Sequence, residues 1–102
     1  MDSIELIEIR VAQKRCQEFE NEIEILIDEL EEAEQEYTLS FYSHRQLRSD
    51  YLLLIFHTEE IPDPRGSAIG HRLAEAFREF GVINRSAWNA ITTKYNISPA
   101  AE

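Results

Sequence analysis

The sequence predicts an α+β domain with strands and helices in the order βαββαβ and an antiparallel sheet. Three observations predict this fold class: a helical apolar stripe over residues 16–37, a two-residue period over residues 38–57, and a second helical stripe after a loop with two prolines. The 102 residues, 43% of them apolar, suffice for one domain with a modest core. We expect this single domain over residues 1–97, followed by a frayed tail over residues 98–102.

The first element, from Ile4 to Ala12, has two interpretations. Ile7, Ile9 and Val11 alternate with polar residues, as in a strand that has one face in water. Ile9 also continues the helical stripe of the next segment backwards, so one helix from Ser3 to Tyr37 is the alternative. We prefer the strand because β-branched residues and leucine favour a pleated surface.

The next element is a helix that carries the whole net charge of the chain. Ten carboxylates and no lysine or arginine lie between Gln17 and Glu36, and the formal net charge of the chain is −10. This charge argues against nucleic acid and against an anionic membrane surface as partners. Apolar residues at steps of three and four form one stripe of the helix, and they are Cys16, Phe19, Ile23, Leu26, Leu30, Ala33 and Tyr37.

After Tyr37 the period changes to two, which predicts a β-hairpin. Apolar and polar residues alternate from Thr38 to His44, a polar turn follows, and residues 50–57 form a dense apolar run. A strand that is apolar on both faces should be central in the sheet and covered on both sides. The two helices can cover one side only, so we expect a second copy of the chain to bury the other.

A loop separates the hairpin from the second helix. Two prolines and a glycine interrupt regular structure from Ile61 to Gly66, and Ser67 is a suitable N-cap. The helix should end at Gly81, and a last strand is predicted from Val82 to Ile97. The apolar face of this helix consists of Ile69, Leu73, Ala76, Phe77 and Phe80.

Composition restricts the compartment and the chemistry. The longest apolar run has six residues, whereas a membrane-spanning helix needs ~20, and no secretory signal pattern is present. Cys16 is the single cysteine, which excludes an internal disulfide and a multi-cysteine metal site and suits the cytoplasm. His44, His57 and His71 are 13 and 14 residues apart, which is no metal-ligand spacing. We therefore expect neither a metal nor another cofactor.

The order strand, helix, strand, strand, helix, strand is that of ferredoxin-like folds. With this order, its length and the residues LIFHTEEI at 54–61 after a hairpin, the chain resembles the dimeric α+β barrel proteins, especially the antibiotic-biosynthesis-monooxygenase-like group. The resemblance implies a homodimer in which two sheets meet face to face. It also implies a cofactor-independent monooxygenase that acts on a small aromatic ligand.

The resemblance suggests few site residues. His71 matches a histidine that the second helix of the family often presents to a pocket between helix and sheet, and it is our candidate base. At about 100° per residue, His71 lies at the margin of the apolar stripe, which suits a pocket rim or solvent. Phe56 stands where the family often has a tryptophan. Phe56, Trp88 and Tyr42 are candidates to line an apolar pocket for a planar ligand, with core packing as the simpler interpretation.

A non-catalytic role is the alternative function. The carboxylates of residues 17–36 lie along one solvated helix, which does not suit the two differently placed carboxylates of a glycosidase. In this alternative the acidic helix binds a basic partner and the barrel is purely structural. An internal apolar cavity with His71 at its wall would favour the enzyme, and a filled interior would favour the interaction protein.

Overall fold

The computed structural model describes residues 3–31, 37–59, 61 and 63–91. Short 3-10 turns precede the first helix at Gln13–Arg15 and follow the second at Arg78–Phe80. The predicted order βαββαβ is confirmed, and the alternative of one helix from Ser3 to Tyr37 is wrong. In chain order the elements are β1 (Ser3–Val11), α1 (Cys16–Glu31), β2 (Tyr37–Ser43), β3 (Asp50–His57), α2 (Ala68–Phe77) and β4 (Gly81–Asn89).

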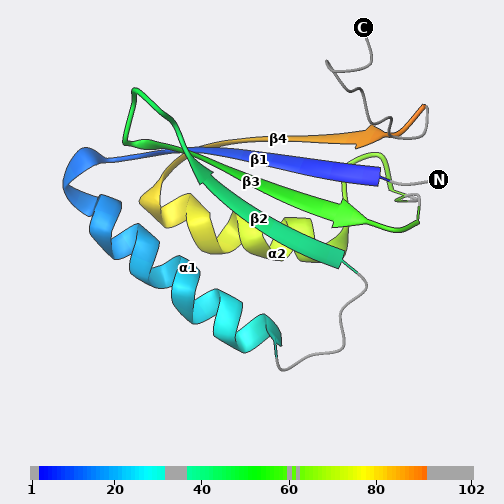
Figure 1. Cartoon of the computed structure of the whole chain (residues 1–102), viewed down its shortest axis with the longest axis horizontal. Coiled ribbons are helices and arrows are strands. Elements are labelled where there is room, and N and C mark those ends of the chain that lie inside the picture. The colour runs from blue at the N-terminus through cyan, green and yellow to red at the C-terminus, as the bar shows by residue number, and fades with distance from the viewer. Residues whose placement is uncertain (1–2, 32–36, 60, 62, 92–102) are drawn as a thin grey trace, which may run out of the picture.

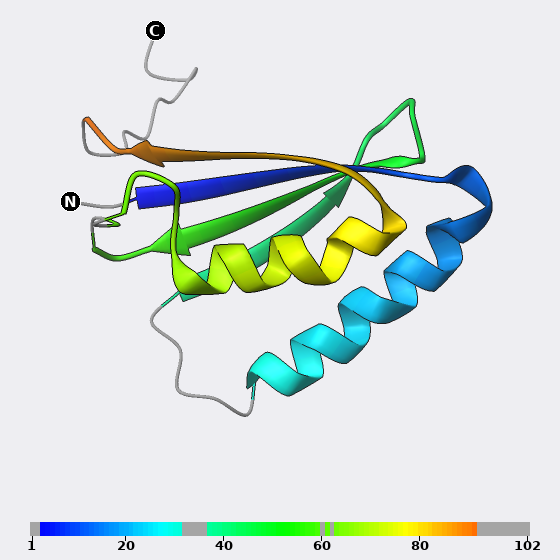
Figure 2. The ribbon, with the colours of Figure 1, turned by 180° about the vertical axis from the view of Figure 1, so that it is seen from behind.

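The four strands form one antiparallel sheet in the order β2-β3-β1-β4, which is the ferredoxin-like arrangement. The apolar strand β3 is central, as predicted, and β1 is the other central strand. Ile7 of β1, for example, lies opposite Leu53 of β3 and Arg85 of β4. Figures 1 and 2 show both helices on the same side of the sheet, so only one of its faces is covered.

Successive residues of a strand point to opposite faces of a sheet, and here the division follows residue number. In β1 the odd-numbered residues from Ser3 to Val11 are buried, whereas the even-numbered ones are partly or fully exposed. The register pairs odd with odd and even with even residues across all four strands. We call the side of the odd-numbered residues the helix-facing side and the side of the even-numbered residues the open face.

The hydrophobic core lies between the helix-facing side and the two helices. Phe19 of α1 is its centre, because the rings of Tyr51, Phe77 and Phe80 lie 4.7, 5.1 and 5.4 Å from the ring of Phe19. Tilted and edge-on ring pairs at these distances are favourable. The other buried hydrophobic residues of the two helices are Ile23, Leu26, Leu30, Leu73 and Ala74. No helix among the described residues is long and apolar enough to cross a membrane.

Two element boundaries differ from the predictions. Tyr37 begins β2 opposite His57, although the helical stripe predicts it in the first helix. Aromatic residues favour strands, and a spacing of four cannot show where a helix ends. The last strand stops at Asn89, so Ala90 and Ile91 lie beyond it. Some predictions fall outside the described residues, namely Ala33 in the helical stripe, position 62 in the predicted loop, residues 92–97 in the predicted last strand and the predicted tail 98–102.

Candidate functional site

Two hollows of the molecule bear on function, and they lie on opposite faces and near opposite ends of the sheet. One is a cleft of about 1020 Å³ on the helix-facing side, where β3 ends and α2 begins. The other is a groove of about 490 Å³ on the open face, beside the start of β3 and of β4. Both hollows combine apolar surface with titratable side chains.

A buried carboxylate lies directly behind the wall of the cleft. Glu5 is on β1 between the buried residues Ser3 and Ile7, and only 2% of its surface is exposed. Its side chain reaches residues that line the cleft, on β3, β4 and the N-terminus of α2. A buried ionised carboxylate is costly unless it is paired and hydrogen-bonded, so its partners decide whether this arrangement is stable.

Three residues provide those partners. The backbone N–H of Ser67 donates to Glu5 Oε1 at 2.8 Å, and the Ser67 hydroxyl donates to Oε2. His57 Nε2 lies 2.7 Å from Glu5 Oε2, and Arg85 Nη2 lies 3.7 Å from Oε1. Because an ionised carboxylate can only accept, the Nε2 atom of His57 carries the proton of this hydrogen bond.

Ser67 has a second role, as the N-cap that the sequence predicts. Its Oγ accepts a hydrogen bond from the backbone N–H of Gly70 at 3.0 Å, and its hydroxyl group donates a hydrogen bond to Glu5. An N-cap side chain normally satisfies one of the unpaired N–H groups of the first turn. Here the cap also joins the start of α2 to the carboxylate of β1.

Two glycines allow α2 to approach Glu5 this closely. A Cβ atom at Gly66 or at Gly70 would overlap Glu5 Oε1, and at Gly70 it would also lie 2.8 Å from Glu5 Cδ. Gly66 in addition has a φ of 112°, a conformation that other residues rarely adopt. Gly70 weakens the first turn of α2, and its function in the structure is to leave room for the carboxylate.

Arg85 connects Glu5 to the predicted site residue His71. Arg85 Nη1 lies 3.2 Å from His71 Nδ1, and a guanidinium group can only donate hydrogen bonds. In this contact Nδ1 is therefore the acceptor, and a neutral His71 carries its proton on Nε2. Neither His57 Nδ1 nor His71 Nε2 makes a hydrogen bond to another residue that the structure describes.

The remaining walls of the cleft combine apolar surface with paired charge. The ring of Tyr37 lies 6.2 Å from that of His57, and burial raises the pKa of the Tyr37 hydroxyl. Asp63 and Arg65 form an ion pair at 3.1 Å, and hydrogen bonds from Arg65 lower the pKa of Asp63. The other lining residues are Thr58, Glu59, Ile61, Gly66, Ala68 and Ile69.

The structure separates the site residues that the sequence suggests. His71 lines the cleft, on the helix-facing side of the sheet. Phe56, Trp88 and Tyr42 have even numbers and lie on the open face, where they are 42%, 59% and 50% exposed. The sheet lies between His71 and these aromatic rings, so the four residues do not line one pocket. Tyr42 borders the groove, whereas Phe56 and Trp88 line neither hollow.

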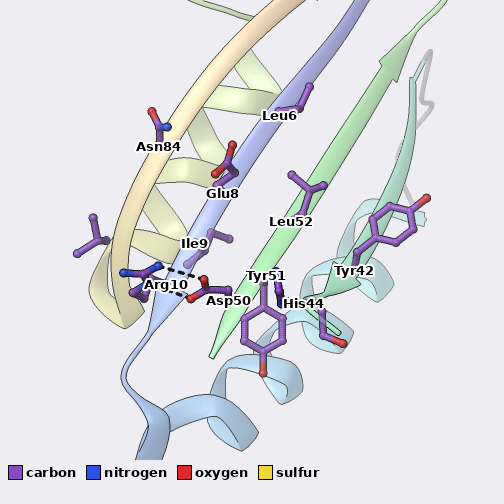
Figure 3. A pocket seen from close by; sticks show the side chains of 12 residues that line it. Leu6, Glu8, Ile9, Arg10, Tyr42, His44, Asp50, Tyr51, Leu52 and Asn84 are labelled. Atoms are coloured by element: carbon purple, nitrogen blue, oxygen red, sulfur yellow. Dashed lines mark hydrogen bonds and ion pairs between the residues drawn. The ribbon is translucent and has the colours of Figure 1, made fainter. Parts of the chain in front are cut away.

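The groove on the open face is shown in Figure 3. The side chains of Leu6, Leu52 and Tyr42 project from three neighbouring strands along it. At one end Arg10 Nε donates to Asp50 Oδ1 at 3.0 Å, and the hydrogen bonds from Arg10 lower the pKa of Asp50. This ion pair is exposed, in contrast to the buried Glu5.

The meeting of Glu5 with His57 and Arg85 is not among the predictions from the sequence, although one signal for it is present. Glu5 has the same parity as Ile7, Ile9 and Val11, so a strand that buries these three also buries Glu5. A carboxylate in the apolar row of a strand predicts a buried partner. The identity of that partner depends on which strands pair with β1, and these strands lie far along the chain.

No family model, curated protein or solved structure matches the chain. The fold and the site define an α+β protein of ferredoxin-like topology with a buried, fully paired carboxylate beside a cleft. Among the described residues, no group of three or more histidine, cysteine, aspartate or glutamate side chains is arranged to hold a metal ion.

Proposed function

We propose that the chain is a homodimeric small-molecule-binding protein whose ligand occupies the cleft at the start of α2. The observation that carries the proposal is the buried Glu5, which orients His57 directly and is joined to His71 through Arg85. Convergent titratable groups beside a hollow are typical of binding and catalytic sites. The chemistry that such groups perform best is proton transfer.

This chemistry is compatible with the cofactor-independent oxygenation of a small aromatic compound. Such a reaction starts when a base removes an acidic proton from the substrate, and the resulting electron-rich anion then reacts with dioxygen. The cleft supplies two imidazoles, and Ile61, Ala68, Ile69 and the ring of Tyr37 supply an apolar wall for an aromatic ring. The protein would contribute deprotonation, orientation and exclusion of water.

A titration with catechol, followed by backbone amide NMR, tests ligand binding. We expect shifts at His57 and at residues 66–71, and none at Val82 or Tyr42 in the groove. The variant Arg85→Gln should weaken binding, whereas Asn84→Ala, one residue away but on the open face, should not. Shifts confined to the groove would contradict the proposed site. No shift at either hollow would favour the alternative in which the acidic helix binds a basic partner.

The second part of the proposal is that a second copy of the chain covers the open face. Val82, which is 74% exposed, and the exposed rings of Phe56 and Trp88 give this face apolar surface that water contacts. The carboxylates of α1 lie on the other side of the sheet, so face-to-face pairing keeps the acidic helices of two copies apart. A two-fold axis would bring the same surface of both copies together.

Sedimentation equilibrium at micromolar concentration tests the assembly. We expect the mass of a dimer, and raised salt should strengthen it because the net charge of −10 on each copy is then screened. A monomer over the whole concentration range would contradict the homodimer. It would leave ligand binding in the cleft intact, because all described residues of the cleft belong to one copy.

A further inference from the structure

We infer that His57, oriented by Glu5, is the proton acceptor of the cleft, and that the ligand is a weak organic acid with a hydroxyl on a planar ring, bound as its monoanion. This inference rests on the proposed function, since it requires a ligand in the cleft. It assigns different tasks to the two histidines that line the cleft.

The contact with Glu5 gives His57 the properties of a base. The Nε2–H group donates to the carboxylate at 2.7 Å, which leaves Nδ1 as the nitrogen with a free lone pair. When Nδ1 takes a proton, the imidazolium that forms is next to a buried negative charge that stabilises it. Glu5 is therefore a positioning residue, which fixes the tautomer of His57 and balances its charge.

His71 has the opposite environment. Its Nδ1 accepts a hydrogen bond from Arg85 at 3.2 Å, so a proton on this nitrogen would break the contact and place two cations side by side. The remaining nitrogen, Nε2, carries a proton and can only donate while His71 is neutral. His71 is therefore suited to hold the ligand oxygen rather than to take its proton.

The charges around the cleft select a monoanion. Glu5 and Arg85 offset each other, as do Asp63 and Arg65, so Glu59 is the remaining charged residue among the described residues of the lining before proton transfer. In the transfer the O–H bond of the ligand breaks, the proton goes to His57 Nδ1, and the electron pair stays on the ligand oxygen. The imidazolium balances one negative charge on the ligand. A second negative charge on the ligand would face Glu59 and would have no cation to balance it.

The apolar part of the cleft selects the rest of the ligand. Tyr37, Ile61, Ala68 and Ile69 line it together with the charged groups. A flat hydrocarbon ring matches these walls, because apolar surface gains free energy when it leaves water. The ring hydroxyl would lie toward the two histidines and Arg85.

The experiment uses 4-nitrophenol, which absorbs visible light only as the anion. At one pH unit below the pKa of the probe, about a tenth of the free probe is ionised. We expect more than half of the bound probe to be ionised, a rise of about fivefold, together with a ¹⁵N signal for protonated His57 Nδ1. His57→Gln keeps a donor for Glu5, and this variant should bind the probe without ionising it.

Two further variants complete the test. His71→Gln should weaken binding of 4-nitrophenol and leave the bound probe ionised, and Arg78→Gln, an exposed substitution on the turn after α2, should change neither. A probe that binds in the cleft but stays neutral overturns this inference and leaves the proposed function standing. Ionisation that survives His57→Gln but not His71→Gln also overturns it. If 4-nitrophenol does not bind at all, the proposed function and the inference fail together.

Discussion

The two faces of the sheet are made from the same strands, yet they treat apolar and charged side chains in opposite ways. On the helix-facing side Leu53 and Ile55 are fully buried, and the one carboxylate behind the cleft is paired on both oxygens. On the open face the rings of Phe56 and Trp88 are exposed near one end of the strands, and the exposed ion pair of Arg10 and Asp50 lies near the other. The helix-facing side is covered by the two helices of the same chain, whereas neither helix covers the open face.

The largest effect should come from placing a charge on each face of β3. Leu53→Asp buries a carboxylate that has no partner, and this costs several kcal/mol of the ~5–15 kcal/mol that stabilise a domain. We expect this variant to be unfolded by circular dichroism. Leu52→Asp, one residue away on the open face, should keep the fold and dissociate the proposed dimer in sedimentation. If both variants fold equally well, the division of the sheet into two faces is wrong.

The next effect compares two glutamates of β1. Glu5→Ala leaves His57, Ser67 and Arg85 without their acceptor, and removing one partner of a buried pair typically costs about 3–5 kcal/mol. Glu8→Ala, on the open face, should change the free energy of unfolding by less than about 0.5 kcal/mol. Urea denaturation measures both values. Equal losses would show that Glu5 is not paired as described.

A smaller effect is expected at Gly70. Replacing glycine by alanine inside a helix usually stabilises it by about 0.5–1 kcal/mol. Here the added methyl group would meet the carboxylate of Glu5, so Gly70→Ala should destabilise the protein, by about 1–3 kcal/mol. The double variant with Glu5→Ala should be less affected by the methyl group than the wild type. Thermal unfolding of all four proteins gives the comparison, and additive losses would contradict the contact.

The smallest effect concerns the exposed pair on the open face. Hydrogen bonds from Arg10 lower the pKa of Asp50 in the folded protein. The stability that this pair contributes is therefore present above the pKa of the unfolded state, ~3.9, and is lost as the pH falls through the lower folded value. Carboxyl NMR titration should show the pKa of Asp50 rise in Arg10→Gln. If the pKa of Asp50 is the same in Arg10→Gln as in the wild type, Arg10 does not pair with Asp50 in solution.

The same comparison explains what the sequence could predict. Periodicity and turn residues predicted the order of elements, the central place of β3 and the cap at Ser67, because these depend on neighbours a few residues apart. The site depends on contacts over longer separations, such as Glu5 with Ser67 and with His57, 62 and 52 residues further along. The alternation of apolar and polar residues along β1 places Glu5 on the buried side, but only the order of the strands shows which side chains contact it. For the same reason the sequence alone cannot separate Phe56 from His71, although one position along β3 changes the face.

The position of β1 between β3 and β4 also has a consequence for how the chain folds. Ser3 is hydrogen-bonded to Asn89, 86 residues further along, so the centre of the sheet forms only when distant parts of the chain meet. Closing such large loops costs entropy before any contact compensates for it. Refolding should therefore be slower than that of helical proteins of this size, on the order of milliseconds or longer. The hairpin of β2 and β3, whose strands are joined by a short turn, is the part of the sheet that can form first.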